Sequence, residues 1–221
     1  MGKKLPILPV WERWKALTQF LALSDHVLLS QQEQWKTLPI ADKNTIKIVR
    51  QDGPYKFETD GKTYEEILSD RHILSCVVLL NSYALVESLV RQVYEYLIPN
   101  TSINTPVLAD LRSGATTLQT ILKSGGIETW GTKLLNDLGR DWGYVESNLS
   151  GLVEVAVIRN GIAHGESAVT QTMHNRALSN GASLPWPLMG EIKLDIATLK
   201  EYRHRLRSFA RVIEHGAEEL L

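Results

Sequence analysis

The stretch LLNSYALVESLVRQVYEYL, from Leu79 to Leu97, decides the fold. Its apolar residues fall on nearly every side of a helix, which is typical of a central helix that neighbours cover from several directions. The helical pattern extends over residues 64–98, and Pro99 ends it. Polar residues such as Asn81 and Glu87 interrupt the pattern, so the segment is too polar for a bilayer crossing. We therefore expect a core helix and no membrane partner.

Further helices and one hairpin are expected around this central helix. Apolar residues recur at helical spacing in 10–36, 105–123, 128–138 and 145–165, and in a last helix that starts near Asp195. The alternating segments TIKIV and YKFET, each followed by a turn signal (QDGP and DG), predict a small β-hairpin. The polar stretch 165–191 is rich in Gly, Ser and Pro, and we expect it to be a long loop.

These elements predict an all-α fold, an antiparallel bundle of four to five helices with a small β-hairpin in the N-terminal region. We expect two parts. Residues 1–63 form an extension with one helix and the hairpin, and residues 64–221 form the bundle.

The composition limits the function classes. The 221 residues carry a formal net charge of −1, so nothing global indicates nucleic acid or anionic membrane as a partner. The single cysteine, Cys76, excludes a disulfide framework within one chain and is expected to be a buried small residue. The short apolar stretch near the N-terminus is broken by Pro6 and Pro9, which is unlike a signal peptide. We expect a cytoplasmic protein with no metal site and no cofactor.

A second stretch, VIRNGIAHG from Val157 to Gly165, carries the candidate chemistry. It lies in the last turns of the helix 145–165, and Gly165 is suited to the position after a helix end. An arginine and a histidine at this spacing are expected about once by chance in a chain of this composition. The context adds weight, because the motif ends an apolar helix and a polar residue, Asn160, directly follows Arg159.

The segment IRNGIAH, after a helix such as LLNSYALVESLVRQVYEYL, resembles the HEPN superfamily of helical bundles. In that family an Arg, four to six residues and a His, often with a polar residue after the Arg, mark a metal-independent endoribonuclease. The resemblance covers roughly residues 64–221 and is strongest at the two helices. It implies a homodimer with a composite active site. Some members that act beside a nucleotidyltransferase antitoxin carry a tyrosine two positions after the His, where this chain has Glu166.

The chemistry of metal-free RNA cleavage calls for the same residue types. It needs a base for the 2′-OH proton, an acid for the leaving 5′ oxygen and positive charge on the phosphate. Histidine titrates near neutrality and arginine offers a charged fork, so we predict His164 and Arg159 as catalytic residues. Asn160 lies four residues before His164 on the same helix face, and we predict that it orients the imidazole or binds the ribose.

Helix geometry favours two copies of the chain. Residues five apart point about 140° away from each other, so Arg159 and His164 of one chain converge poorly on one phosphate. A two-fold dimer would place both pairs around one cleft, and a monomer should then be inactive. The structural alternative makes Arg159 a surface ion-pair partner and His164 an ordinary residue at a helix C-terminus.

Glu87 has two interpretations. Its spacing to Arg91 fits an i,i+4 ion pair. Alternatively, it reaches Arg159 or His164 across the bundle and fixes the orientation of that side chain, since a carboxylate in so apolar a helix requires a partner.

The last helix carries a basic stripe opposite its apolar side. In a nearly neutral protein such a stripe is a candidate for holding the RNA backbone, although a solvated helix face is the simpler explanation. Its members are Lys200, Arg203, Arg207 and Arg211.

The sequence thus predicts a HEPN-like homodimeric endoribonuclease that leaves a 2′,3′-cyclic phosphate and a 5′-hydroxyl. By resemblance, such proteins serve as toxins or antiphage defence effectors restrained by an antitoxin or another regulatory protein. The alternative is a non-catalytic HEPN-like module that binds a partner protein or a nucleotide. A third hypothesis is a helical regulator whose hairpin, within residues 45–64, docks a neighbour by strand addition.

Overall fold

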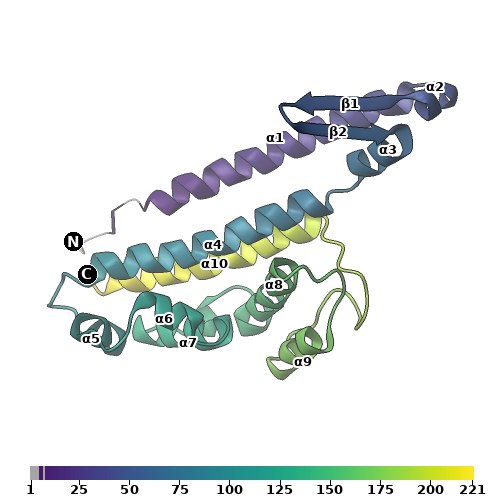
Figure 1. Cartoon of the computed structure of the whole chain (residues 1–221). Helices are drawn as coiled ribbons and strands as arrows, with labels where there is room; N and C mark the ends of the chain where they lie inside the picture. The colour runs from purple at the N-terminus through teal and green to yellow at the C-terminus, as the bar shows by residue number, and fades with distance from the viewer. Residues whose placement is uncertain (1–4, 7) are drawn as a thin grey trace.

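The computed structural model describes residues 5–6 and 8–221. It is mostly helical with one two-stranded antiparallel sheet, which confirms the predicted helical fold and the predicted hairpin (Figure 1). The elements in chain order are α1 (Pro9–Thr37), α2 (Ile40–Thr45), β1 (Lys47–Asp52), β2 (Tyr55–Asp60), α3 (Gly61–Ser69), α4 (His72–Leu97), α5 (Pro106–Ser113), α6 (Leu118–Lys123), α7 (Ile127–Asp137), the 3-10 helix η1 (Trp142–Tyr144), α8 (Asn148–Ala163), α9 (Gln171–Ser179) and α10 (Ile196–Glu219).

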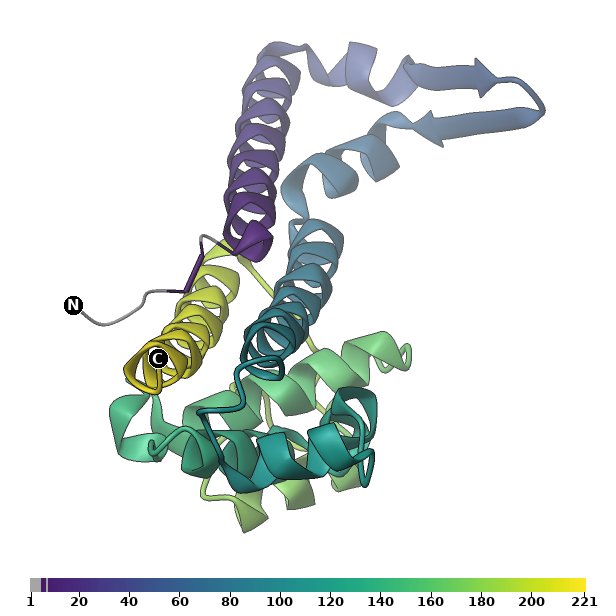
Figure 2. The same ribbon diagram turned by 90° about the vertical axis from the view of Figure 1, so that its left-hand side faces the viewer.

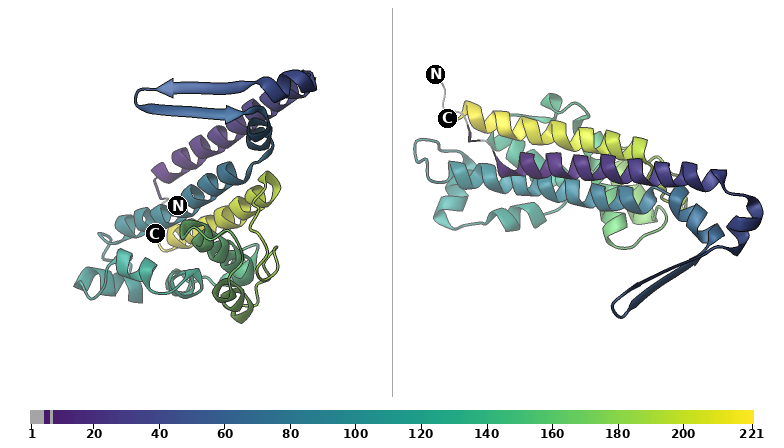
Figure 3. Two further views of the ribbon diagram at one scale, coloured as in Figure 1. Left: turned by 45° about the vertical axis from the view of Figure 1, so that its right-hand side comes forward. Right: turned by 90° about the horizontal axis from the view of Figure 1, so that it is seen from above.

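Helices α4 and α10 lie side by side along the length of the molecule (Figures 1 and 3). They run in the same direction, because the amide of Leu194, just before α10, donates to His72 at the start of α4 over 3.0 Å. Helix α1 runs opposite to both, since its first residues bond Gln92 and Glu214, late in α4 and α10. The antiparallel expectation is therefore wrong for the α4–α10 pair. The long connection between the two helices, residues 98–195, gives the chain room to return and lie parallel.

One continuous core joins the long helices to the shorter ones. Helix α1 adds Val10, Trp14 and Leu21 to the cluster that α4 and α10 form, so α1 shares the core of the helices after residue 63. Figure 2 shows α1 and the hairpin on one side of α4 and α10, and helices α5 to α9 on the other. The fully buried side chains of α4 include Val78, Leu79, Leu89, Val90, Val93, Tyr94 and Leu97.

Two predicted helices are each divided in the structure. The segment 64–98 breaks at Asp70, which adopts an extended conformation and accepts a hydrogen bond from the amide of His72 at 2.7 Å. The segment 105–123 breaks at Gly114, whose φ of 75° lies in the left-handed region that ends helices. Thr117 then caps α6 by accepting from the amide of Thr120. The single-helix predictions missed both breaks because a polar side chain can cap a helix inside an otherwise periodic pattern.

The stretch predicted as a loop, 165–191, contains helix α9, so the loop prediction is wrong for residues 171–179. The side chain of Thr170 caps α9 by accepting from the amide of Met173. Met173 and Ala177 are the residues that α9 buries, which leaves too short an apolar pattern to indicate a helix.

The hairpin projects away from the bundle (Figure 3). Its strands pair from Lys47 with Asp60 to Asp52 with Tyr55. The sequence did not predict the short helix α2. At the base of the hairpin, Gly61 packs closely against α2, because a Cβ on Gly61 would lie 1.9 Å from the carbonyl oxygen of Lys43.

By length and composition, the helical stretch Gly61–Leu97 also resembles a membrane span. The same composition suits a core helix, and in the structure many apolar side chains of α4 are buried in the bundle. Cytoplasmic location and the absence of a membrane partner stay predictions.

Candidate active site

The end of α8 forms a tight cap that turns the chain back over the helix. Gly165 has a φ of 79°, its amide donates to the carbonyl of Ile162 at 3.1 Å, and the amide of Glu166 donates to the carbonyl of Gly161 at 2.9 Å. These two bonds form a Schellman motif with His164 at the C-cap. The motif therefore places Glu166 beside the last turn of α8, next to His164.

Gly161 lets helix α9 approach α8 closely. A Cβ at this position would lie 2.7 Å from Cε and 2.9 Å from Sδ of Met173 on α9. The two glycines of VIRNGIAHG thus have different tasks. Gly161 makes room for α9, and Gly165 supplies the left-handed conformation that ends α8.

Asn160 and His164 line one pocket of about 460 Å³ between the end of α8 and α9. His164 is exposed, and Asn160 is half-buried. The pocket therefore brings together two of the three predicted catalytic residues within one chain. Its lining consists of Val157, Asn160, Gly161, His164, Glu166, Thr170, Thr172, Met173 and Arg176.

Arg159 points toward α4 and is not among the residues that line this pocket. Its guanidinium lies 4.8 Å from the ring centroid of Tyr83, a cation–π contact with a buried aromatic ring. Its Nη1 donates to Oδ1 of Asn160 at 2.9 Å. Arg159 thus acts on the pocket through Asn160, which it holds by the side-chain oxygen.

Glu87 lies near Arg159 without a direct ion pair. Burial raises the pKa of Glu87 above its ordinary value, while the charges of Arg159 and Arg91 both lower it. Within residues 8–221, no nitrogen of either arginine lies within 4.0 Å of the Glu87 carboxylate. Glu87 therefore interacts electrostatically with Arg91 and Arg159 but is bonded to neither.

Arg176 is a cation of the pocket that the sequence placed in a loop. It forms a two-point contact with Glu128 of α7, Nε to Oε1 at 2.9 Å and Nη2 to Oε2 at 2.8 Å. Burial raises the pKa of Glu128, but the hydrogen bonds and charge of Arg176 outweigh that effect, so the pKa lies below its ordinary value. The pair attaches α9 to α7.

The basic stripe of α10 does not form a continuous exposed surface, which corrects the sequence prediction. Arg203 is only 7% exposed; it lies over the ring of Trp14 and donates to Oγ1 of Thr18 at 2.8 Å. Arg211 lies over Trp11, 3.9 Å from the ring centroid. Helix α1 therefore covers this part of α10, because its tryptophans offer aromatic faces to the arginines.

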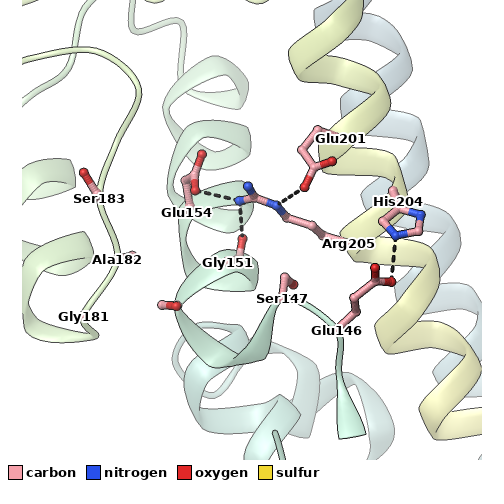
Figure 4. A pocket seen from close by; sticks show the side chains of 11 residues that line it. Glu146, Ser147, Gly151, Glu154, Gly181, Ala182, Ser183, Glu201, His204 and Arg205 are labelled. Carbon is pink, nitrogen blue, oxygen red and sulfur yellow. Dashed lines mark hydrogen bonds and ion pairs between the residues drawn. The ribbon is translucent and has the colours of Figure 1, made fainter. Parts of the chain in front are cut away.

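A different, larger pocket of about 590 Å³ lies between α8, α10 and residues 181–183 (Figure 4). Arg205 donates to Glu154 at 2.6 Å and to Glu201 at 3.0 Å, and His204 lies 2.7 Å from Glu146. These ion pairs offset only part of the negative charge of the three glutamates, and none of the predicted site residues lines the pocket. Among the residues that the structure describes, in this pocket and elsewhere, no three His, Cys, Asp or Glu side chains lie close enough together to hold a metal ion.

No protein-family model, no curated protein and no solved structure matches this chain.

Proposed function

We propose that this chain is a metal-independent endoribonuclease that acts as a homodimer. It cleaves RNA by attack of the 2′-OH on the adjacent phosphate and leaves a 2′,3′-cyclic phosphate and a 5′-hydroxyl. One observation carries the proposal: a single pocket is lined by His164 and Glu166, two side chains able to transfer protons, and by Asn160, which Arg159 holds in place.

The two proton transfers have separate groups in this pocket. Glu166 takes the proton of the 2′-OH as the 2′ oxygen forms its bond to phosphorus. The bond from phosphorus to the 5′ oxygen breaks, and protonated His164 gives its proton to that oxygen. Exchange with water then returns a proton to His164 and removes one from Glu166.

Arg159 and Asn160 support these steps from the wall of the pocket. The hydrogen bond from Arg159 fixes the side-chain oxygen of Asn160, which leaves the amide NH₂ to bind substrate oxygens. The ring of Tyr83 contacts Arg159 from the α4 side, and the charge of Glu87 acts on it without a bond, so Arg159 is a positioning residue in this proposal.

The resemblance to the HEPN superfamily adds three elements to the proposal. It implies the two-fold homodimer, a role as toxin or antiphage defence effector, and control by an inhibitory partner protein. His164 is exposed at the end of α8, where a second copy or an inhibitor is able to reach it.

The test is cleavage of end-labelled RNA in EDTA by the wild type and by three variants, His164→Ala, Glu166→Gln and Asn160→Ala. We expect the wild type to cut, and His164→Ala and Glu166→Gln each to lower the rate by about 100-fold or more. Asn160→Ala should lower it less. The products should accept a 5′-phosphate from a kinase without prior phosphatase treatment, because they carry a 5′-hydroxyl.

Matched controls separate the site from general charge effects. His204→Ala removes an exposed histidine of α10 that bonds Glu146, and it should leave the cleavage rate unchanged. If the folded wild type binds RNA without cutting a broad pool of sequences, the endoribonuclease proposal is wrong and the non-catalytic binding module takes its place.

A further inference from the structure

The pocket beside His164 contains a fixed cation, Arg176. Its bonds to Glu128 use the Nε hydrogen and one hydrogen of Nη2. A guanidinium has five N–H donors, so three of them stay available, including both on Nη1. Within residues 8–221, Glu128 supplies the only acceptors bonded to this side chain, and Arg176 also lines the pocket.

Glu128 removes much of the freedom of the arginine. The two-point contact holds the guanidinium plane, and both side chains are largely buried, with 25% of Arg176 and 19% of Glu128 exposed. A fork held in this way loses less conformational entropy when it binds an oxyanion.

Gly126 makes this arrangement possible. A Cβ on Gly126 would lie 1.9 Å from Nη2 of Arg176 and 2.2 Å from Oε2 of Glu128. The backbone of Gly126 is extended, so the absence of a side chain matters here for space alone. The glycine lets the ion pair lie directly against the start of α7.

The rest of the pocket suits one nucleotide unit. Its volume of about 460 Å³ is within the usual range for small-molecule sites, about 300–1,000 Å³. Val157 and Met173 offer an apolar surface, and Thr170 and Thr172 offer hydroxyls at the start of α9. Glu166 is the one acidic residue in the lining, and Arg176 is the one arginine or lysine there.

We infer that this pocket binds a phosphate group of the RNA strand, with Arg176 as its cation and Glu128 as the positioning residue of Arg176. The inference rests on the proposed function for the identity of the strand. It also assigns the phosphate contact to Arg176 rather than to Arg159, which lies outside the pocket.

The experiment measures binding apart from cleavage. The probe is a single-stranded 2′-deoxy hexanucleotide, which has no 2′-OH and is not cleaved. Its Kd is measured by calorimetry for the whole chain at several salt concentrations. Arg176→Gln should raise the Kd about tenfold and lower the slope of log Kd against log salt by about 0.7, the loss of one phosphate contact on a single strand.

Two further variants test the positioning role. Glu128→Asp and Gly126→Ala both retain the charges of the pair but disturb the fork, so both should weaken binding with little change in the salt slope. Arg50→Gln removes the same charge from the hairpin, which lies on the opposite side of α4 and α10 from α9, and should change neither quantity (Figure 1). Thermal unfolding of each variant confirms that the chain is folded.

The outcomes separate this inference from the proposed function. A folded Arg176→Gln protein with the wild-type salt slope and Kd overturns the inference, even if the wild type cuts RNA. If Arg176 controls binding but no variant or wild type cuts RNA, the endoribonuclease proposal is wrong and the phosphate site stands. Loss of both binding and cleavage in Arg176→Gln supports both.

Discussion

Asp137 is a buried carboxylate that joins three elements of the bundle. It accepts hydrogen bonds from the hydroxyls of Tyr94 and Thr105 and from the amide of Val107, each at 2.8 Å. Asp137→Ala should lower the free energy of unfolding by about 3 kcal/mol or more, because it leaves three buried donors without an acceptor. Urea unfolding at pH 7 measures the change.

The control for Asp137 is Tyr94→Phe. It removes one donor and leaves the carboxylate with its other two bonds, so its cost should be about 1 kcal/mol. A loss below 1 kcal/mol for Asp137→Ala would contradict the prediction, because water must then satisfy the donors that the structure shows as buried.

The lowered pKa of Glu128 makes the stability of the fold depend on pH. Its pKa is lowered in the folded chain, where the hydrogen bonds of Arg176 outweigh burial. A lowered carboxyl pKa stabilises the fold above the unfolded value, and this stability is lost as the pH falls through the folded value. At pH 7, Glu128→Gln should therefore cost about 1–2 kcal/mol, and the difference from the wild type should shrink as the pH falls through the lowered pKa of Glu128.

Urea unfolding of both proteins at pH 7, 5, 4 and 3 gives this difference directly. Glu33→Gln is the matched control, since Glu33 pairs with Lys36 on an exposed face and should change the stability by less than about 0.5 kcal/mol at every pH. A difference in the free energy of unfolding between Glu128→Gln and the wild type that stays constant from pH 7 to pH 3 would contradict the prediction.

Single residues also show what the sequence was able to predict about the site. The spacing of four predicted a shared face for Asn160 and His164, and the two side chains line one pocket. The role of Arg176 was out of reach, because its contact with Glu128 spans 48 positions and its helix carries little apolar pattern. Arg203 followed the periodicity of α10, but periodicity does not reveal that Trp14 covers it.

At the scale of elements, the hairpin β1–β2 is nearly independent of the bundle. Of its residues, Thr59 alone is buried, and the strand ends Lys47 and Asp60 are paired neighbours. Replacement of residues 49–58 by two glycines keeps the buried Thr59 and the α3 cap Asp60, and it joins the paired residues Ile48 and Thr59. It should therefore change the free energy of unfolding by less than about 1 kcal/mol, because little apolar area is lost. The RNA cleavage rate should also stay within about twofold of the wild-type rate.

Urea unfolding and the EDTA cleavage assay measure these two quantities. Tyr55→Ser with Phe57→Ser is the milder companion variant, since it removes the exposed aromatic side chains and retains the strands. Loss of cleavage in the folded deletion protein would show that the hairpin contributes to the site. Loss of a partner protein with cleavage intact would favour docking by strand addition.

The elements themselves divide into predictable and unpredictable ones for a physical reason. The limits of α1, α7 and α10 follow their apolar patterns, and α10 begins directly after Asp195, close to the predicted start. Asp195 caps α10 by accepting from the amide of Thr198. The short helix α9 buries two apolar side chains, and α2 buries none. Contacts with distant segments stabilise such helices, and these contacts leave little trace in the local sequence.

At the scale of the whole molecule, the placement of Arg159 bears on how two copies share the chemistry. Arg159 holds Asn160 of its own chain, and Asn160 lines the pocket of its own His164. Each copy should therefore carry a complete set of these three residues. A mixture of Arg159→Ala and His164→Ala chains, unfolded and refolded together, should cleave no faster than the mean of the two variants refolded separately.

A composite site would restore a definite fraction of the wild-type cleavage rate. If the site were composite across the two-fold axis, random pairing of equal amounts would make half of the dimers mixed, each with one intact site of two, and would restore about a quarter of the wild-type rate. Affinity tags of two kinds verify that mixed dimers form, and a wild-type and His164→Ala mixture shows the expected dilution. Light scattering gives the mass; an active protein with the mass of one chain contradicts the homodimer, because neither arrangement then involves a second copy.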